Sequence, residues 1–114
     1  MSIKSAECYQ LDPQARSLRV QIEPGHSLLL PFEQLVFAEF EAGDSEDVLT
    51  LHFDTHEVTL RGASLRRIET ALQRRELANV VAVPAQFRAG VKEGQPLITS
   101  IEAVVAPAAG SEPR

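Results

Sequence analysis

The chain has 114 residues, enough for one domain with its own hydrophobic core. Hydrophobic residues make up 44% and charged residues 24%, the proportions of an ordinary globular protein, which argues against disorder over most of the length. The formal net charge of −5 makes the whole protein a poor binder of polyanions, and the longest apolar runs are far shorter than the roughly 20 residues that cross a bilayer.

The N-terminal part of the sequence predicts one clear strand. Residues 1–17 mix polar and apolar types without a period, so we expect an irregular segment with room for one edge strand. Apolar residues then alternate with polar ones from Leu18 to Glu23, which is the pattern of a half-buried strand. The Pro24-Gly25 pair predicts a turn after it.

The next strand is apolar on both sides. Leu28 to Leu30 runs into Pro31, which has no N–H for a ladder and therefore marks an edge, a bulge or a break. A strand resumes over residues 34–41, with Leu35 and Phe37 expected on one face and Val36, Ala38 and Phe40 on the other. Either a curled sheet or barrel buries both faces, or one face is a subunit interface.

Residues 48–61 predict a hairpin whose register can be derived, because Asp54-Thr55 separates two runs of opposite phase. The apolar pairs are Leu49 with Leu60, Leu51 with Val58 and Phe53 with His56; the polar pairs are Val48 with Arg61, Thr50 with Thr59 and His52 with Glu57. A slip by one residue would move the apolar groups to the wet face, which supports this register.

The period becomes helical after Gly62. Ser64 is the expected N-cap of a helix over residues 65–76, with arginines near its C-terminus where they suit the helix dipole. Strands are expected at residues 79–83 and 97–105, joined by a long loop over residues 84–96.

These elements predict an α+β fold. We expect one small antiparallel β-sheet, a meander over residues 18–62, with one amphipathic helix packed on it and two further strands after the helix. A small, partly closed barrel is the alternative. Residues 18–105 form the single domain, and the Pro- and Ala-rich tail at 106–114 is expected to be flexible.

One cluster has residue types that bind metals. The low-ranking candidate ligands of a divalent ion are His52, Asp54, His56 and Glu57. The hairpin register counts against them, because it sends His52 and His56 to opposite faces and makes His52 and Glu57 an ordinary cross-strand pair.

The charges are segregated along the chain. Residues 20–60 carry nine acidic side chains and no Lys or Arg, whereas residues 61–92 carry seven basic side chains against two acidic ones. The exposed candidates for an interaction are Arg61, Arg66, Arg67 and Arg74. A solvated helix face is the simplest interpretation; binding of phosphate or nucleic acid, or pairing with an acidic neighbouring subunit, are the alternatives.

No catalytic or cofactor motif is present. The glycines are scattered, so no phosphate-binding loop is expected, and we expect no cofactor. The single cysteine, Cys8, is interpreted as a structural thiol, and the absence of a secretion signal predicts a cytoplasmic setting. We therefore expect a non-enzymatic, self-associating protein-interaction module, a dimer or higher homo-oligomer, with Leu35 and Phe37 at its interface and no membrane contact.

Overall fold

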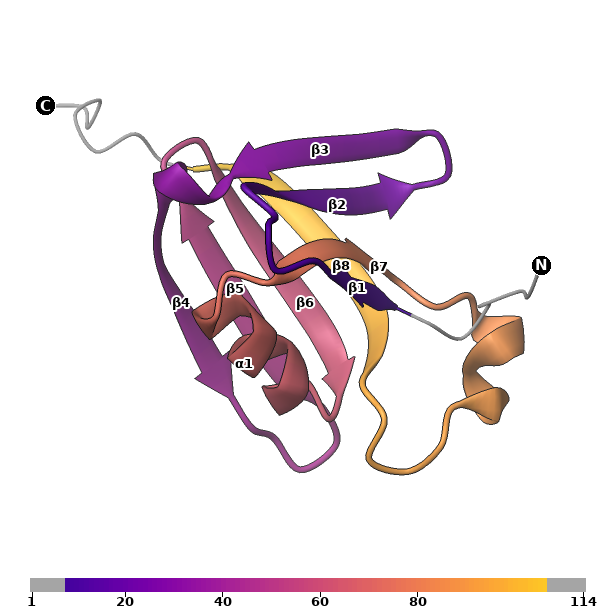
Figure 1. Ribbon diagram of the computed structural model, residues 1–114. Coiled ribbons are helices and arrows are strands. Elements are labelled where there is room, and N and C mark those ends of the chain that lie inside the picture. The colour runs from indigo at the N-terminus through magenta and orange to yellow at the C-terminus, as the bar shows by residue number, and fades with distance from the viewer. Residues whose placement is uncertain (1–7, 107–114) are drawn as a thin grey trace, which may run out of the picture.

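The computed structural model describes residues 8–106 and contains two β-sheets and one α-helix (Figure 1). Sheet A contains, in spatial order, β1 (Tyr9–Leu11), β7 (Leu77–Val81), β2 (Ser17–Glu23) and β3 (His26–Pro31). Sheet B contains β4 (Leu35–Glu41), β5 (Asp47–Phe53), β6 (His56–Ala63) and β8 (Leu97–Val105). The predicted tail after Ala106 lies outside the described residues, as does the start of the predicted irregular segment.

The α+β class with antiparallel strands is confirmed, but the expectation of a single sheet is wrong. Two sheets form, and the described strands do not close into a barrel. Most neighbouring strands are antiparallel, whereas β7 runs parallel to β2 and antiparallel to β1. The meander predicted over residues 18–62 is broken between β3 and β4, which belong to different sheets, although β2–β3 and β4–β5–β6 are consecutive antiparallel neighbours. Strand β7 also enters sheet A between β1 and β2.

Pro31 marks the place where the chain leaves one sheet for the other. It ends β3, an edge strand, and the 3₁₀ turn η1 (Phe32–Gln34) follows directly. Phe32 is buried in the core at this turn. The proline therefore acts as the predicted break, and the turn redirects the chain into sheet B.

The β5–β6 hairpin has the predicted register. Leu49 pairs with Leu60 and Leu51 with Val58 on the buried side, whereas His52 pairs with Glu57 on the other. The agreement follows from the pattern itself, because this pairing places Leu49, Leu51, Phe53, Val58 and Leu60 on one face, where all five are buried.

Helix α1 (Arg66–Gln73) packs across the inner face of sheet B (Figure 1). The N-cap predicted at Ser64 is wrong, because Ser64 has a φ of 56° and Leu65 occupies the cap position. Asp47, at the start of β5, instead accepts a hydrogen bond from the Leu65 N–H to its Oδ2 at 3.1 Å. A carboxylate from a distant strand thus satisfies one of the helix's free donors.

The C-terminal end of α1 is closed by two backbone hydrogen bonds. The Arg75 N–H donates to the Leu72 carbonyl and the Glu76 N–H to the Ala71 carbonyl, both at 2.9 Å. Arg75 has a φ of 58°, the left-handed conformation that this Schellman-type ending requires. The helix is therefore shorter than predicted at both ends.

The segment after the helix differs from prediction in detail. Strand β7 begins two residues earlier than the predicted 79–83, and the predicted 84–96 loop contains the 3₁₀ segment η2 (Ala85–Gly90). Arg88 holds η2 to β8, because its Nε donates to the Val83 carbonyl and its Nη2 to the Thr99 carbonyl, each at 3.0 Å. The strand predicted over 97–105 is confirmed.

The hydrophobic core lies between the two sheets and beneath α1. It is formed by residues from both sheets and the helix, among them Leu18, Val20, Leu30, Leu49, Leu51, Phe53, Val58, Leu60, Ile68, Leu72, Val80 and Ile98. Because this core uses one face of sheet B, the opposite face remains open. Within residues 8–106, no helix is long and apolar enough to cross a membrane.

Candidate interaction surface

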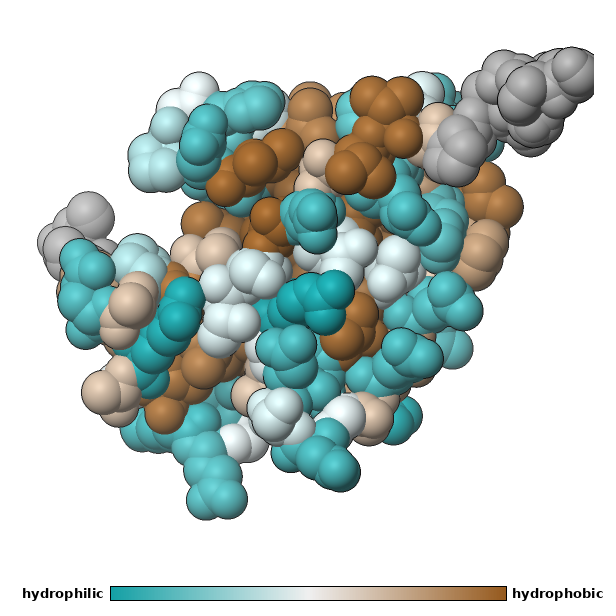
Figure 2. All heavy atoms as spheres, turned by 180° about the vertical axis from the view of Figure 1, so that it is seen from behind, coloured by the Kyte–Doolittle hydropathy of each residue, from teal (hydrophilic) through white to brown (hydrophobic). Residues whose placement is uncertain are grey.

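The open face of sheet B, the face turned away from α1, is built from three cross-strand rows. The rows are Phe37, His52, Glu57 and Val104; Glu39, Thr50, Thr59 and Glu102; and Glu41, Val48, Arg61 and Ser100. Figure 2 views the molecule from behind, where hydrophobic side chains gather in separate patches among hydrophilic ones. The apolar side chains on this face therefore form small separate patches and not one continuous hydrophobic surface.

Phe37 is the most prominent aromatic residue of this face. Its side chain is 50% exposed, and its ring stacks on the His52 imidazole with centroids 4.1 Å apart and 15° between the planes. His52 is in turn held between two carboxylates, with Nε2 3.4 Å from Glu39 Oε1 and Nδ1 3.2 Å from Glu57 Oε2. The exposed ring is thus supported by neighbours on three strands.

A β-bulge at Val36 overturns the predicted alternation of this strand. Leu35 pairs with Phe53 and packs against the core, whereas Phe37 pairs with His52 on the open face. The extra residue shifts the phase by one, so Leu35 and Phe37 lie on opposite faces. Val36 is left 63% exposed. Of the two interpretations of this strand, burial of both faces by a curled sheet or barrel is contradicted.

Strand β4 is also an edge of sheet B. It pairs with β5 on one side, and no strand among residues 8–106 pairs with its other side. An open edge exposes backbone donors and acceptors that can pair with another chain. Glu39 and Glu41 follow the exposed apolar residues Val36 and Phe37 along β4, and such charges limit unselective strand pairing.

The candidate arginines do not form one patch. Arg61 on the open face lies 3.5 Å from Glu46, Arg66 lies 4.7 Å above the ring of Phe40, Arg67 lines a groove beside β1, and Arg74 is the C-cap of α1. Each guanidinium therefore belongs to a different environment, although all four come from one short stretch of chain.

The candidate metal ligands are also dispersed. His52 and Glu57 face each other on the open face, whereas the ring of His56 contacts the Thr55 hydroxyl, Nδ1 to Oγ1, at 3.0 Å. The backbone N–H of Asp54 donates to the Gln34 carbonyl in the turn. In the part of the chain that the structure describes, no group of three or more His, Cys, Asp or Glu side chains is placed to hold a metal ion.

Cys8 lies inside the protein next to the start of β8. It is 1% exposed, and its thiol lies 3.4 Å from the Pro96 carbonyl oxygen, to which it donates. Burial beside a backbone acceptor fits a structural thiol, because reactive cysteines need solvent access.

Two members of the surface escaped sequence reasoning. The sequence predicts His52 as a candidate metal ligand or an ordinary cross-strand partner of Glu57, not as an interaction residue, and it gives no prediction for Val104, which is 46% exposed. His52 joins the Phe37 row through the pairing of β4 with β5. Val104 joins it through the pairing of β6 with β8, two strands that are separated in sequence by α1, β7 and η2. The alternation of residues along β8 could have predicted that Val104 faces away from the core. Only the order of the strands in sheet B places it in the same row as Phe37.

Comparison with protein-family models, with curated proteins and with solved structures finds no match for this chain. The class is therefore defined by the fold itself: an α+β domain of two four-stranded sheets sharing one core, with an open sheet face and an unpaired edge strand beside it.

Proposed function

We propose that this protein is a non-enzymatic module that self-associates through the edge strand β4 and the adjoining end of the open face. The observation that carries the proposal is the pair of exposed apolar residues on that edge, Val36 at 63% and Phe37 at 50%. Large apolar side chains on an unpaired strand edge favour pairing with another chain.

A two-fold pairing of β4 with β4 of a second copy suits the local chemistry. With the axis at Phe37, the two Phe37 rings lie side by side, and the backbone groups of both edges find partners. The two copies of Glu39 then lie four residues apart along the ladder, about 14 Å at the rise of an antiparallel strand. Their repulsion is weak at that distance, because it exceeds the Debye length at physiological salt.

The same features disfavour open-ended growth. A bulge twists an edge strand, and Glu39 and Glu41 penalise pairings that bring like charges directly opposite. An isologous pair uses each β4 edge once and leaves none for a third copy. We therefore expect a dimer.

Binding of nucleic acid or phosphate has less support as the alternative. It would use Arg61, Arg66, Arg67 and Arg74, and a phosphate backbone requires a continuous basic stripe. Their separate environments provide no such stripe. Steep salt dependence of binding to mixed RNA and DNA would be the sign of this alternative.

Sedimentation velocity over a wide range of protein concentration tests the dimer. We expect the wild-type protein to dimerise and Phe37→Glu to be a folded monomer, because the new charge lies on a surface that is wet in the monomer. Its thermal melt should fall only by what the loss of the Phe37–His52 stack costs. Phe87→Glu is the matched control, since Phe87 is 40% exposed on η2, away from β4. A wild-type monomer at the highest concentration, or a Phe37→Glu dimer, would contradict the proposal.

A further inference from the structure

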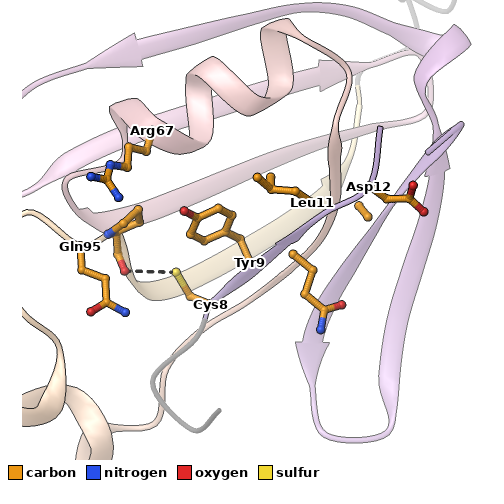
Figure 3. Close-up of a pocket in the computed structure, with 9 residues that line it drawn as sticks. Cys8, Tyr9, Leu11, Asp12, Arg67 and Gln95 are labelled. Carbon is orange, nitrogen blue, oxygen red and sulfur yellow. Dashed lines mark hydrogen bonds between the residues drawn. The ribbon is translucent and has the colours of Figure 1, made fainter. Parts of the chain in front are cut away.

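A groove of about 700 Å³ runs along the outer edge of β1. It is bordered by β1 and the residue on either side of it, Cys8 to Asp12, and by Arg67 of α1, Ala78 of β7, and Gln95 and Pro96 before β8. Figure 3 shows Tyr9 and Leu11 projecting from β1 on the side of α1, where Arg67 lies. The groove therefore lies between a sheet edge and a helix.

The backbone of β1 presents unused hydrogen-bonding groups to this groove. The Cys8 carbonyl accepts from the Val81 N–H at 2.9 Å, and the Asp12 N–H donates to the Glu76 carbonyl at 2.7 Å. Since antiparallel pairing uses every second residue, the peptide groups of Tyr9 and Leu11 point away from β7. Within residues 8–106, no strand pairs with this outer side of β1.

The side chains along the groove indicate which residue types would suit a peptide strand that paired with the edge of β1. Tyr9 and the 54%-exposed Leu11 offer an apolar surface next to the edge. Arg67 has no ion pair or hydrogen bond within the described part of the chain, whereas Asp12, at the other end, already accepts a hydrogen bond from the Gln14 N–H. The groove is thus positive at the Arg67 end and negative at the Asp12 end.

We propose that the edge of β1 binds an extended acidic peptide segment of another protein as an added strand. The peptide backbone pairs with Tyr9 and Leu11, an apolar side chain packs on their side chains, and a carboxylate of the peptide meets Arg67. The far wall of the groove, formed by Arg67 and Gln95, supplies side-chain selectivity that a bare strand edge lacks.

None of the other three edge strands, β3, β4 and β8, has this combination. Strand β4 carries a bulge and two glutamates, which oppose an acidic strand, and β3 ends at Pro31. In β8, the Ile98 and Thr99 carbonyls already accept hydrogen bonds from the Val83 N–H and the Arg88 side chain. The inference rests on the proposed role as an interaction module but uses a different surface from β4. A failed peptide experiment therefore leaves the sedimentation result intact, and a monomeric protein can still bind the peptide.

A random peptide library displayed on phage, selected on the wild-type protein and counter-selected on Arg67→Glu, provides the probe. We expect enriched peptides with an acidic residue among β-branched ones. A labelled copy of the most enriched peptide should bind Arg67→Glu about tenfold more weakly than wild type, the effect of losing one charge-assisted contact. Arg74→Glu, the same change on the same helix, should bind like wild type.

Two readouts distinguish strand addition from simple charge attraction. By NMR hydrogen exchange, bound peptide should slow the Tyr9 and Leu11 amides, while Gln10 is already protected by β7. N-methylation along the peptide should abolish binding at every second residue, because only alternate N–H groups face β1.

Several results would overturn the inference. The first is that the selection enriches no peptide, and the second is that it enriches the same peptides on Arg67→Glu as on wild type. The third is a peptide that binds but leaves the hydrogen-exchange rates of the Tyr9 and Leu11 amides unchanged. Arg67-dependent binding of inorganic phosphate alone would assign a simple anion site. Protection of Tyr9 and Leu11 that rises with protein concentration without peptide would assign the edge to a second copy of this chain.

Discussion

The Phe37 ring and the His52 imidazole are stacked across neighbouring strands, 4.1 Å apart between centroids and 15° from parallel. This contact gives an exposed aromatic side chain a defined orientation, because His52 is itself held by Glu39 and Glu57. A ring that is already ordered loses little conformational freedom when a partner covers it. The stack therefore bears on both the stability of the monomer and its association.

A double-mutant cycle on the monomer should measure this stack. We expect Phe37→Ala and His52→Ala to be coupled by about 0.5–1.5 kcal/mol in the free energy of unfolding, the usual value of a stacked aromatic pair. Urea denaturation provides the measurement, at protein concentrations low enough that the protein is monomeric. Phe37→Ala combined with Glu102→Ala, three strands away on the same face, should be additive. Coupling indistinguishable from that control would show that the contact contributes nothing.

Asp47 should contribute more to stability than Ser64 through capping of α1. Replacing Asp47 by Ala removes the acceptor of the Leu65 N–H, and we expect a loss of about 1 kcal/mol in the free energy of unfolding. Asp44→Ala, an exposed aspartate of the preceding loop, is the matched control and should change little. If Ser64→Ala costs more than Asp47→Ala, the helix is capped as its sequence alone indicates.

Arg75→Gly should stabilise the protein. Arg75 has a φ of 58°, a conformation that costs an L-residue about 1–2 kcal/mol and glycine almost nothing. After allowing for the greater freedom of glycine in the unfolded chain, we expect a gain of about 0.5–1 kcal/mol, visible in urea denaturation. Arg74→Gly should have the opposite sign, because Arg74 has helical angles, with a φ of −88°. Losses in both variants would contradict the assigned helix ending.

Gly62→Ala should be strongly destabilising. A Cβ at this position would collide with the Leu97 carbonyl and lie 3.0 Å from Ile98 Cα, both backbone atoms of β8. Strand β8 would have to shift, at a cost of about 2–3 kcal/mol. Gly90→Ala, where a Cβ meets nothing within 4 Å, provides the control in thermal melts. Similar melting temperatures for the two variants would show that β8 can shift to make room for the Cβ at little cost in stability.

Local patterns predicted the elements better than their arrangement. The β5–β6 register follows from residues that are close in sequence, and its apolar and polar pairs have only one consistent alignment. The insertion of β7 between β1 and β2 has no comparable signal, because parallel partners are joined by a long stretch of chain. A one-residue bulge at Val36 was equally invisible, since either phase of that strand exposes apolar side chains.

The candidate surface was predicted in part. Phe37 is predicted because it is a large apolar residue in a strand that carries apolar side chains on both faces, and in the structure it is 50% exposed. The groove at β1 could not be foreseen, because it joins Tyr9, Arg67 and Gln95 from three distant parts of the chain. Arg67 was singled out only for its charge.

The central position of β7 in sheet A has a consequence for how the chain is made. Among the strands of residues 8–106, β1 pairs with β7 alone, so Tyr9 cannot join the sheet until Val80 has been synthesised and placed. Closing so long a loop is slow, and a nascent chain that has emerged only through α1 carries β1 without a partner. During translation, β1 is therefore synthesised early but can pair only late, once β7 from the C-terminal third of the chain is available.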